Sequence, residues 1–179
     1  GTSHDITGSF DAVIMEDGVL QVNPIEITLT SYGDTWTYDA QPHSRPGVSV
    51  EGAFLPVDIS TVPSATRTET NAGKYPNTIS YTTTSSFKPQ NYNIHENIDT
   101  LVINKRPLYL IGVDKLVDYQ NGVDQSTTMF TYGNLVSGHT ATGISYLAHG
   151  ESVGDHTGVF SGTLHVEDAL HNDVTSNYE

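Results

Sequence analysis

The chain has 179 residues, contains no cysteine and carries 21 acidic against 7 basic side chains, for a formal charge of −14. Without cysteine it forms no disulfide and offers neither a thiolate metal site nor a cysteine nucleophile. The negative charge repels phosphate backbones and anionic headgroups, so nucleic acid is not an expected partner, and no apolar run is long enough for membrane insertion.

Alternating apolar and polar residues predict β-strands along most of the chain. Over residues 20–30 the alternation runs on both sides of Pro24, and over residues 100–112 it returns on both sides of Pro107. A period of two residues is typical of half-buried strands. No run has helical periodicity of helix length, and "VEDALHND" is expected to form at most one turn. Further strands are predicted at residues 34–40, 77–87, 128–136, 142–148 and 157–168.

Short motifs recur at a separation of 81 residues. Tyr38 in "TYDAQPHS" matches Tyr119 in "DYQNGVDQ" (119 − 38 = 81), Gly73 matches Gly154 (154 − 73 = 81), and "VLQVN" superposes on "TLVIN". An Asn-Tyr pair recurs 86 residues apart, so the second copy carries extra residues near "HVEDALHND". A fixed period is typical of repeat architecture. We therefore predict an all-β fold of small tandem modules, sandwich-like or β-grasp-like, with a short, stiff joint.

These motifs resemble the MBG/YDG repeats that occur in tandem on cell-wall-anchored adhesins of Gram-positive bacteria. "YDAQPH" is similar to the family's Tyr-Asp/Asn-Gly-x-Pro turn, "NAGKYPNTIS" and "SVGDHTGVFSG" to its Val-Gly turn and following strand, and "NYNI" with "DTLVINKRP" to its Asn-Tyr and Gly-Thr-Leu-x-Val ending. "DVTSNYE" is similar to the same Asn-Tyr element. Ala40 and Asp99 stand where the family commonly has glycine.

The resemblance implies a location and a set of partners. It implies a segment of a bacterial cell-surface adhesin that is extracellular and attached to the cell wall as part of a larger protein. Host mucin, glycans or extracellular matrix are the implied partners, beside neighbouring repeats of the same chain.

The repeat divides the chain into three segments. Residues 1–23 are the closing strand region of a preceding repeat, residues 24–105 are the first full β-repeat, and residues 106–179 are the second β-repeat, which lacks its own closing strand. An open strand edge is a template for pairing with another chain. Two explanations stay open: the structural unit is phased differently from the sequence repeat, or the N-terminal strand pairs with a neighbour in trans.

Histidines are concentrated in the second repeat. The spacing lacks HxH and HExxH patterns, and the alternation around His165 turns that side chain toward solvent, so we predict a solvated surface and no metal site. Full protonation of all eight histidines changes the formal charge to −6 (−14 + 8 = −6), which predicts acid-promoted adhesion or self-association. The candidate pH-sensing residues are His139, His149, His156, His165 and His171.

Clusters of acidic and amide side chains are candidates for calcium binding. "MEDG", "HENID", "NGVDQ" and "VEDALHND" supply the oxygen ligands that Ca²⁺ prefers, but none matches the EF-hand spacing. We therefore expect solvated loops and no cofactor, with calcium that stiffens module joints as the alternative.

Four aromatic residues are candidates for ligand binding: Trp36, Tyr38, Tyr119 and Tyr132. An exposed aromatic ring stacks on the apolar face of a sugar, which favours a carbohydrate platform. The alternative is a packing role, because Trp36 aligns with Val117 and Tyr38 with Tyr119, as core or turn positions do in repeats.

The sequence does not predict an enzyme. It contains no Gly-x-Ser-x-Gly elbow and no phosphate-binding glycine loop followed by a helix. Besides the adhesin, two interpretations stay open: a ligand-free structural stalk, and an accessory carbohydrate-binding module of a secreted glycoside hydrolase.

Overall fold

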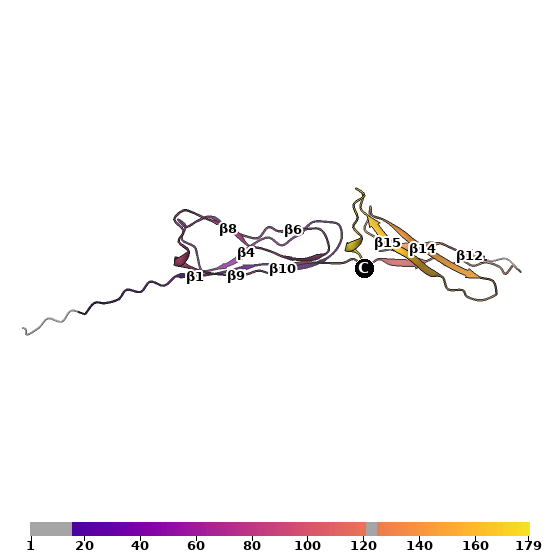
Figure 1. Cartoon of the computed structure of the whole chain (residues 1–179), viewed down its shortest axis with the longest axis horizontal. Coiled ribbons are helices and arrows are strands. Elements are labelled where there is room, and N and C mark those ends of the chain that lie inside the picture. Colours follow the sequence, from indigo (N-terminus) through magenta and orange to yellow (C-terminus); the bar gives the residue numbers. More distant parts are fainter. Residues whose placement is uncertain (1–15, 121–124) are drawn as a thin grey trace, which may run out of the picture.

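The computed structural model describes residues 16–120 and 125–179. Most of the segment 1–23 and of the "NGVDQ" cluster therefore lies outside the described residues. The described chain is an elongated all-β molecule with two short 3₁₀ turns and no α-helix, so the predicted fold class is confirmed (Figure 1). Nothing helical in these two ranges has the length and apolar content needed to cross a membrane.

Ten strands make the first half of the molecule, drawn in indigo to magenta in Figure 1. They are β1 (Ile25–Ser31), β2 (Asp34–Thr37), β3 (His43–Ser44), β4 (Val48–Glu51), β5 (Ile59–Ser64), β6 (Thr68–Glu69), β7 (Gly73–Pro76), β8 (Ser80–Thr83), β9 (Tyr92–Asn97) and β10 (Thr100–Asn104).

Two long lines of backbone run side by side through this half. β1 followed by β2 forms one line, and β9 followed by β10 forms the other. The lines pair in parallel from Ile25↔Tyr92 to Thr37↔Asn104 with a single register offset (92 − 25 = 67; 104 − 37 = 67). β4 and β7 add antiparallel strands at the outer edges, while β5 with β8 and β3 with β6 form small separate sheets.

Asp99 links the two lines by hydrogen bonds at the point where both are interrupted, between β1 and β2 and between β9 and β10. The Gly33 N–H donates to Asp99 Oδ2 at 3.0 Å, and the Asp99 N–H donates to Ser31 Oγ at 2.9 Å. A Cβ atom at Gly33 would lie 2.6 Å from the Asp99 carboxyl group, so this close approach requires glycine. The aspartate that replaces the glycine of the resembled family therefore holds the ladder together at its break.

Asn77 connects two loops inside the first half. Its side chain is fully buried, and its amide Nδ2 donates to the backbone oxygens of Tyr32 at 2.9 Å and Arg45 at 2.8 Å. Its own N–H donates to the Asp99 carbonyl oxygen at 2.8 Å. Because backbone carbonyl groups need donors, this one buried amide satisfies two of them at once.

The apolar alternation around Pro24 is confirmed on one side only. Ile27 and Leu29 of β1 are buried and pack with Tyr92, as the period of two predicts. Leu20 and Val22 are 88% and 82% exposed, and residues 16–24 belong to no strand, so the prediction of a half-buried strand there is wrong for the chain by itself. A strand forms only where a neighbour satisfies its backbone, and no described segment lies beside it.

Tyr92 marks the Asn-Tyr motif of the first half. It follows the 3₁₀ turn η2 (Pro89–Asn91), and its hydroxyl accepts from the Leu55 N–H at 3.1 Å and donates to Asp58 Oδ2 at 2.7 Å. Burial, and then the hydrogen bond to Asp58, raise the pKa of Tyr92. The motif therefore anchors the start of β9 to the loop that carries Leu55 and Asp58.

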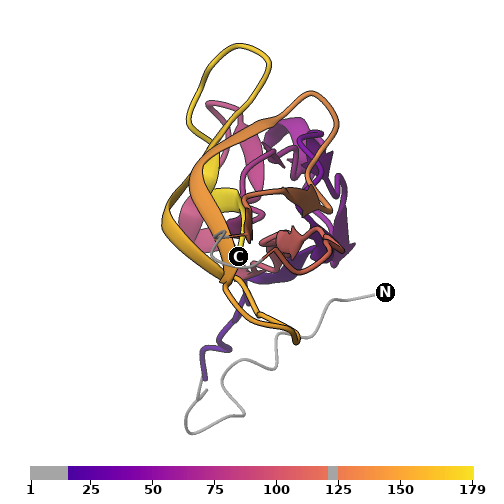
Figure 2. The same ribbon diagram turned by 90° about the vertical axis from the view of Figure 1, so that its right-hand side faces the viewer.

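Five strands make the second half, drawn in orange to yellow. One pair of the first half recurs here at the repeat distance: Ser64↔Ser80 of β5 and β8 has its counterpart in Ser145↔Ser161 (145 − 64 = 81; 161 − 80 = 81). The strands are β11 (Tyr109–Gly112), β12 (Gln125–Thr127), β13 (Phe130–Gly133), β14 (Thr140–Gly150) and β15 (Val159–Glu167), followed by the 3₁₀ turn η3 (Thr175–Asn177). Figure 2 shows β14 and β15 as a long hairpin along one side of the molecule.

Candidate functional site

The two halves share one hydrophobic core where they meet. Tyr38 and Ile103 come from the first half, and Val166, Val174 and Tyr178 come from the second. Tyr38 is 1% exposed, and its ring meets the Tyr178 ring edge-on at a centroid distance of 5.6 Å. Removing these side chains from water stabilises the joint in the same way as it stabilises the interior of either half.

Buried polar contacts also cross the joint. Asn177 is buried, its Oδ1 accepts from the Ala72 N–H at 2.7 Å, and its Nδ2 donates to Asn71 Oδ1 at 3.0 Å. The Arg106 guanidinium donates to the Tyr38 carbonyl oxygen at 3.3 Å. Because these bonds are directional, they fix the orientation of one half relative to the other.

Tyr178 occupies a site equivalent to that of Tyr92. Its hydroxyl accepts from the Val136 N–H at 3.2 Å and shares a hydrogen bond with His139 Nδ1 at 2.8 Å. Val136 and His139 lie 81 positions after the two partners of Tyr92 (136 − 55 = 81; 139 − 58 = 81). Burial raises the pKa of Tyr178. The repeat thus preserves a tyrosine anchor but exchanges its aspartate partner for a histidine.

The Trp36 side chain packs against neighbouring side chains. The Trp36 ring stacks on His43 at 4.9 Å and is half-buried against the joint core. His43 in turn bonds to Asp39 Oδ1 at 2.9 Å. Partial burial favours the neutral acid, but hydrogen bonds from the Gln41 N–H and from His43 outweigh it and hold the pKa of Asp39 below its usual value. Ala40, at the position where the resembled family has glycine, adopts a positive φ of 63°.

The four candidate ligand-binding residues do not form one platform. Tyr38 is buried, so its ring is unavailable to a sugar, and Trp36 is covered by His43 on a ring face. Tyr132 of β13 is half-buried and meets the Phe130 ring edge-on at 5.2 Å. Tyr119 lies after β11 and is 54% exposed. The packing alternative therefore describes Tyr38 and Trp36 better than the carbohydrate platform does.

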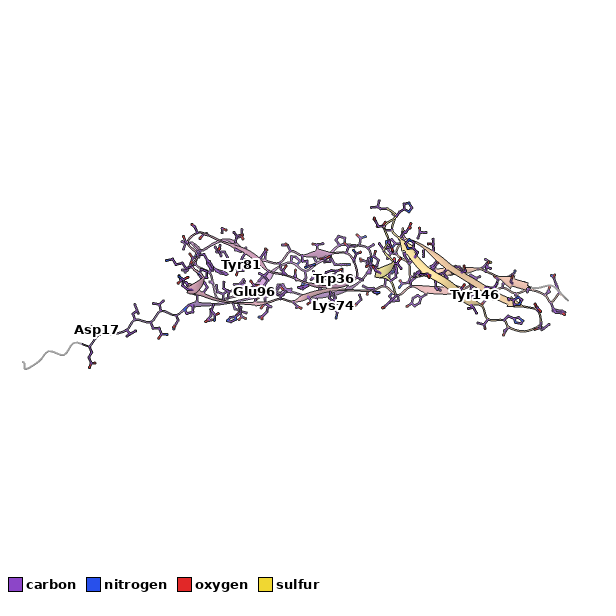
Figure 3. The ribbon with its side chains drawn as sticks, viewed as in Figure 1. Asp17, Trp36, Lys74, Tyr81, Glu96 and Tyr146 are labelled. Carbon is purple, nitrogen blue, oxygen red and sulfur yellow. The ribbon has the colours of Figure 1, made fainter. Side chains whose placement is uncertain are left out.

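A groove of about 810 Å³ opens on the second half. Residues 113–117 and 148–158 line it, together with Tyr119 and with Tyr146 of β14, which is labelled in Figure 3. Its two long walls, residues 113–120 and 151–158, belong to no strand. Apolar side chains on these walls, including Leu116 and Val153, are exposed. Sequence reasoning noted the open strand edge of the second repeat, but it did not identify this groove.

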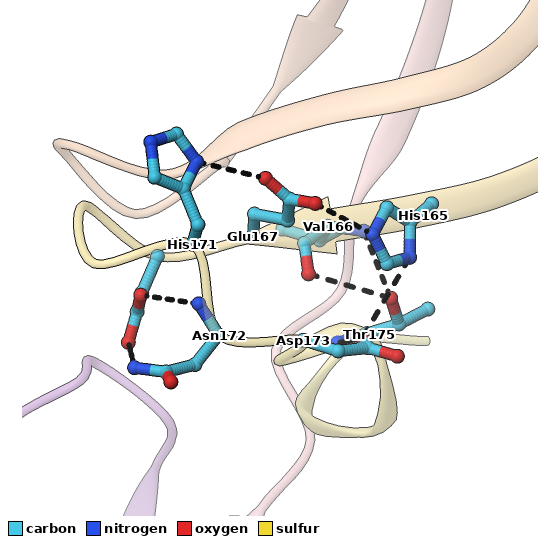
Figure 4. A network of polar contacts seen from close by, with 8 residues as sticks. His165, Val166, Glu167, His171, Asn172, Asp173 and Thr175 are labelled. Carbon is cyan, nitrogen blue, oxygen red and sulfur yellow. Dashed lines mark hydrogen bonds and ion pairs between the residues drawn. The ribbon is translucent and has the colours of Figure 1, made fainter.

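A network of polar contacts connects the end of β15 with the loop that follows it (Figure 4). One carboxylate lies between two imidazoles: Glu167 Oε1 is 3.0 Å from His165 Nε2, and Glu167 Oε2 is 3.1 Å from His171 Nδ1. His165 Nδ1 also lies 3.8 Å from Asp173 Oδ1. Hydrogen bonds from His171 and His165 lower the pKa of Glu167, and hydrogen bonds from Thr175 lower the pKa of Asp173. The network holds the segment that leads to Tyr178.

Acidification is expected to destabilise this loop. Because the pKa of Glu167 is lower in the folded than in the unfolded chain, its contribution to stability is present above the unfolded value and is lost as the pH falls through the folded value. Urea unfolding measured between pH 7 and pH 3 should show a falling midpoint in this range. The variant Glu167→Gln should lose part of that dependence, and an unchanged pH profile in the variant would contradict the assignment.

The candidate pH-sensing histidines lie in three separate places. His165 and His171 share Glu167, His139 bonds to Tyr178 beside the joint core, and His149 and His156 line the groove. In residues 16–120 and 125–179, no group of three or more histidine, aspartate or glutamate side chains is arranged to hold a metal ion. Sequence reasoning missed Asn177, and it identified His139 only as a candidate pH-sensing residue, because the partners of both side chains are distant in sequence.

Comparison of the chain with protein-family models, with curated proteins and with solved structures found no match.

Proposed function

We propose that this chain is a stiff two-repeat segment of an extracellular, cell-wall-attached bacterial adhesin, where it holds adhesive surfaces at a distance from the cell. Two lines of support meet in this proposal. The sequence motifs resemble repeats that occur in such adhesins, and the contacts around Tyr92 and Tyr178 recur at the repeat distance.

The continuous core at the joint is the observation that carries the spacer role. Tyr38 and Ile103 share one cluster with Val166, Val174 and Tyr178, and hydrogen bonds cross the same boundary. A flexible linker would let the halves reorient freely, whereas a shared buried core makes reorientation cost the burial of those side chains. A segment with such a joint keeps its two ends at a fixed distance and orientation.

Spin-label distances test the stiffness directly, because the chain has no cysteine of its own. With Lys74→Cys in β7 and Ser161→Cys in β15, both at exposed positions, we expect a single narrow distance distribution. Inserting Gly-Ser-Gly-Ser between Asn104 and Lys105 should broaden it at least about twofold. Equal widths with and without the insertion would contradict a rigid joint.

The adhesive part of the proposal has its own test. Mucin and glycan binding are measured at pH 7 and at about pH 5, on either side of the ordinary histidine pKa. Saturable binding that strengthens in acid supports an adhesive segment. Absence of binding at both pH values, with a rigid joint, leaves the ligand-free stalk as the function.

A further inference from the structure

In the sequence after Lys115, histidines are the only side chains that can carry a positive charge. This stretch contains no lysine and no arginine, whereas aspartate and glutamate recur along it. Its carboxylates therefore have no permanently charged partner among the side chains of the same stretch. Because an unperturbed imidazole takes up its proton at about pH 6.5, mild acid supplies the missing counter-charge.

Two of these histidines and two carboxylates surround the base of the loop that follows β15. Glu167 lies between His165 and His171, with contacts of 3.0 and 3.1 Å, and a backbone bridge pairs Glu167 with Asp173. His165 faces both carboxylates, since its Nε2 is 3.0 Å from Glu167 Oε1 and its Nδ1 is 3.8 Å from Asp173 Oδ1. Together these four side chains form the histidine clasp, which Figure 4 shows from close by.

The two ring nitrogens of His165 decide which protonation state suits the clasp. A neutral imidazole has one N–H, so it donates to one carboxylate and turns a nitrogen lone pair toward the other. A protonated imidazole has an N–H on both nitrogens, and its charge attracts both Glu167 and Asp173. His171 adds a second cation beside Glu167, but its side chain is 86% exposed against 43% for His165, so solvent screening leaves His165 the larger effect.

The clasp holds the segment that the second half contributes to the joint. Val166 and Val174 flank its loop, and both are buried in the joint core. The Val174 N–H donates to the Val166 carbonyl oxygen at 2.9 Å, and the Val166 N–H donates to Thr175 Oγ1 at 2.8 Å. Opening the clasp therefore loosens the segment that carries both valines and leads to Tyr178.

We propose that the histidine clasp is a pH-dependent lock on the joint, which tightens from about pH 8 to about pH 5.5 as His165 and His171 become charged. This lock presupposes the rigid joint of the proposed function and adds a condition to it: the segment is stiffest in mild acid. Because the charged imidazoles have these carboxylate partners only in the folded chain, protonation stabilises the fold. At lower pH the loss described above for Glu167 takes over, so the stability of the joint passes through a maximum.

The neighbouring groups of the clasp do not reverse the sign of this effect. The cross-strand neighbours on β14 are Thr142 and Thr140, and η3 adds Thr175, so the strand and the turn beside the clasp bring hydroxyl groups to it and not charges. The Arg106 guanidinium, a fixed cation at the joint, donates to two backbone oxygens. The two imidazoles and the two carboxylates therefore set the sign.

His139 is a joint histidine with the opposite preference. The Tyr178 hydroxyl accepts from the Val136 N–H, so it donates to His139 Nδ1, and this contact suits the neutral imidazole. Hydrogen bonds from Asn172 and, more weakly, attraction by His139 lower the pKa of Asp168. This carboxylate offsets part of the cost of a charge on His139, so the gain at the clasp is retained.

Hydrogen exchange of the loop amides measures the lock. The N–H groups of Val166 and Val174, both bonded within the loop, should gain protection at least about threefold from pH 8 to pH 5.5, after correction for the intrinsic exchange rate. The whole chain also loses negative charge over this range, which stabilises it in general. Variants of the clasp are therefore compared with the wild type.

Two variants and a control isolate the clasp. Asp173→Asn keeps an oxygen for the Thr175 N–H, which donates to Asp173 Oδ1 at 2.9 Å, but removes the charge, whereas His165→Asn removes the imidazole. Each should reduce the gain in protection to less than about half that of the wild type. The two side chains are 64% and 43% exposed, so neither variant endangers folding. The control His156→Asn, where the imidazole lies 2.9 Å from the Ser152 carbonyl oxygen, should keep the full gain.

The spin labels at Lys74→Cys and Ser161→Cys separate this lock from the proposed function. A distance distribution that narrows from pH 8 to pH 5.5, and does not narrow in His165→Asn, supports the lock. A narrow distribution at both pH values with unchanged protection of the loop, or an equal gain in both clasp variants and the control, overturns the lock and leaves the rigid joint standing. A broad distribution at both pH values overturns the rigid joint itself and the lock with it.

Discussion

Replacing Tyr38 with alanine is expected to lower the free energy of unfolding by about 3–5 kcal/mol, the usual cost of deleting a buried aromatic ring. Tyr38 is 1% exposed and is the largest fully buried side chain among the described residues, and it shares the joint core with Tyr178 and Ile103. The cavity would open between the halves, so the joint should loosen as well. Urea unfolding followed by the fluorescence of Trp36, which packs against the same core, measures both effects.

Tyr119 provides the matched control for Tyr38. It holds the same place in the second repeat but is 54% exposed, so Tyr119→Ala is expected to change the stability of the monomer by less than about 0.5 kcal/mol. Equal losses in the two variants would mean that burial at the joint is not what stabilises the chain.

Changing Asn77 to aspartate is expected to cost about 3–5 kcal/mol, although the side chain keeps its size. The amide Nδ2 donates to the carbonyl oxygens of Tyr32 and Arg45. Aspartate puts a carboxylate oxygen there, so both carbonyl groups lose their donor and face a negative charge at a fully buried position. Differential scanning calorimetry at pH 7 measures the loss.

Two further variants separate charge from hydrogen bonding at this position. Asn77→Ala removes the donors without adding a charge and should cost about 2 kcal/mol. Asn93→Asp tests the same substitution at an exposed asparagine of β9, whose Nδ2 donates to Glu26, and should change stability by less than about 1 kcal/mol. If Asn77→Asp is no worse than Asn93→Asp, the amide does not connect the two loops.

The local pattern of the sequence predicted the strands well where a partner strand exists. Ile27 and Leu29 are buried as their alternation requires, β10, β13 and β15 fall within predicted runs, and β14 contains one. The same alternation continues through Leu20 and Val22, where the chain provides no neighbour, and there the prediction of a strand fails. Alternating apolar and polar residues therefore indicate that a segment is able to form a strand. Whether the strand forms depends on a partner segment far away in the chain.

The contacts at the joint could not be predicted, because each depends on residues separated by most of the chain. Asn177 bonds to Asn71 and Ala72, more than 100 positions earlier. The Asn-Tyr motif predicted that Tyr92 and Tyr178 are equivalent, but not that Asp58 bonds to one and His139 to the other. Composition likewise identified the histidines without showing that two of them share Glu167.

The constant register between the two long lines of the first half has a mechanical consequence. The chain enters this half at Ile25 and leaves it at Asn104, at opposite ends of the parallel ladder that joins β1 and β2 to β9 and β10. Tension applied through the neighbouring segments would slide one line along the other, so the hydrogen bonds of the ladder share the load and must break together. Rupture under such shear is governed by the unfolding rate. We therefore expect the first half to withstand sudden loads that would open a hairpin one hydrogen bond at a time.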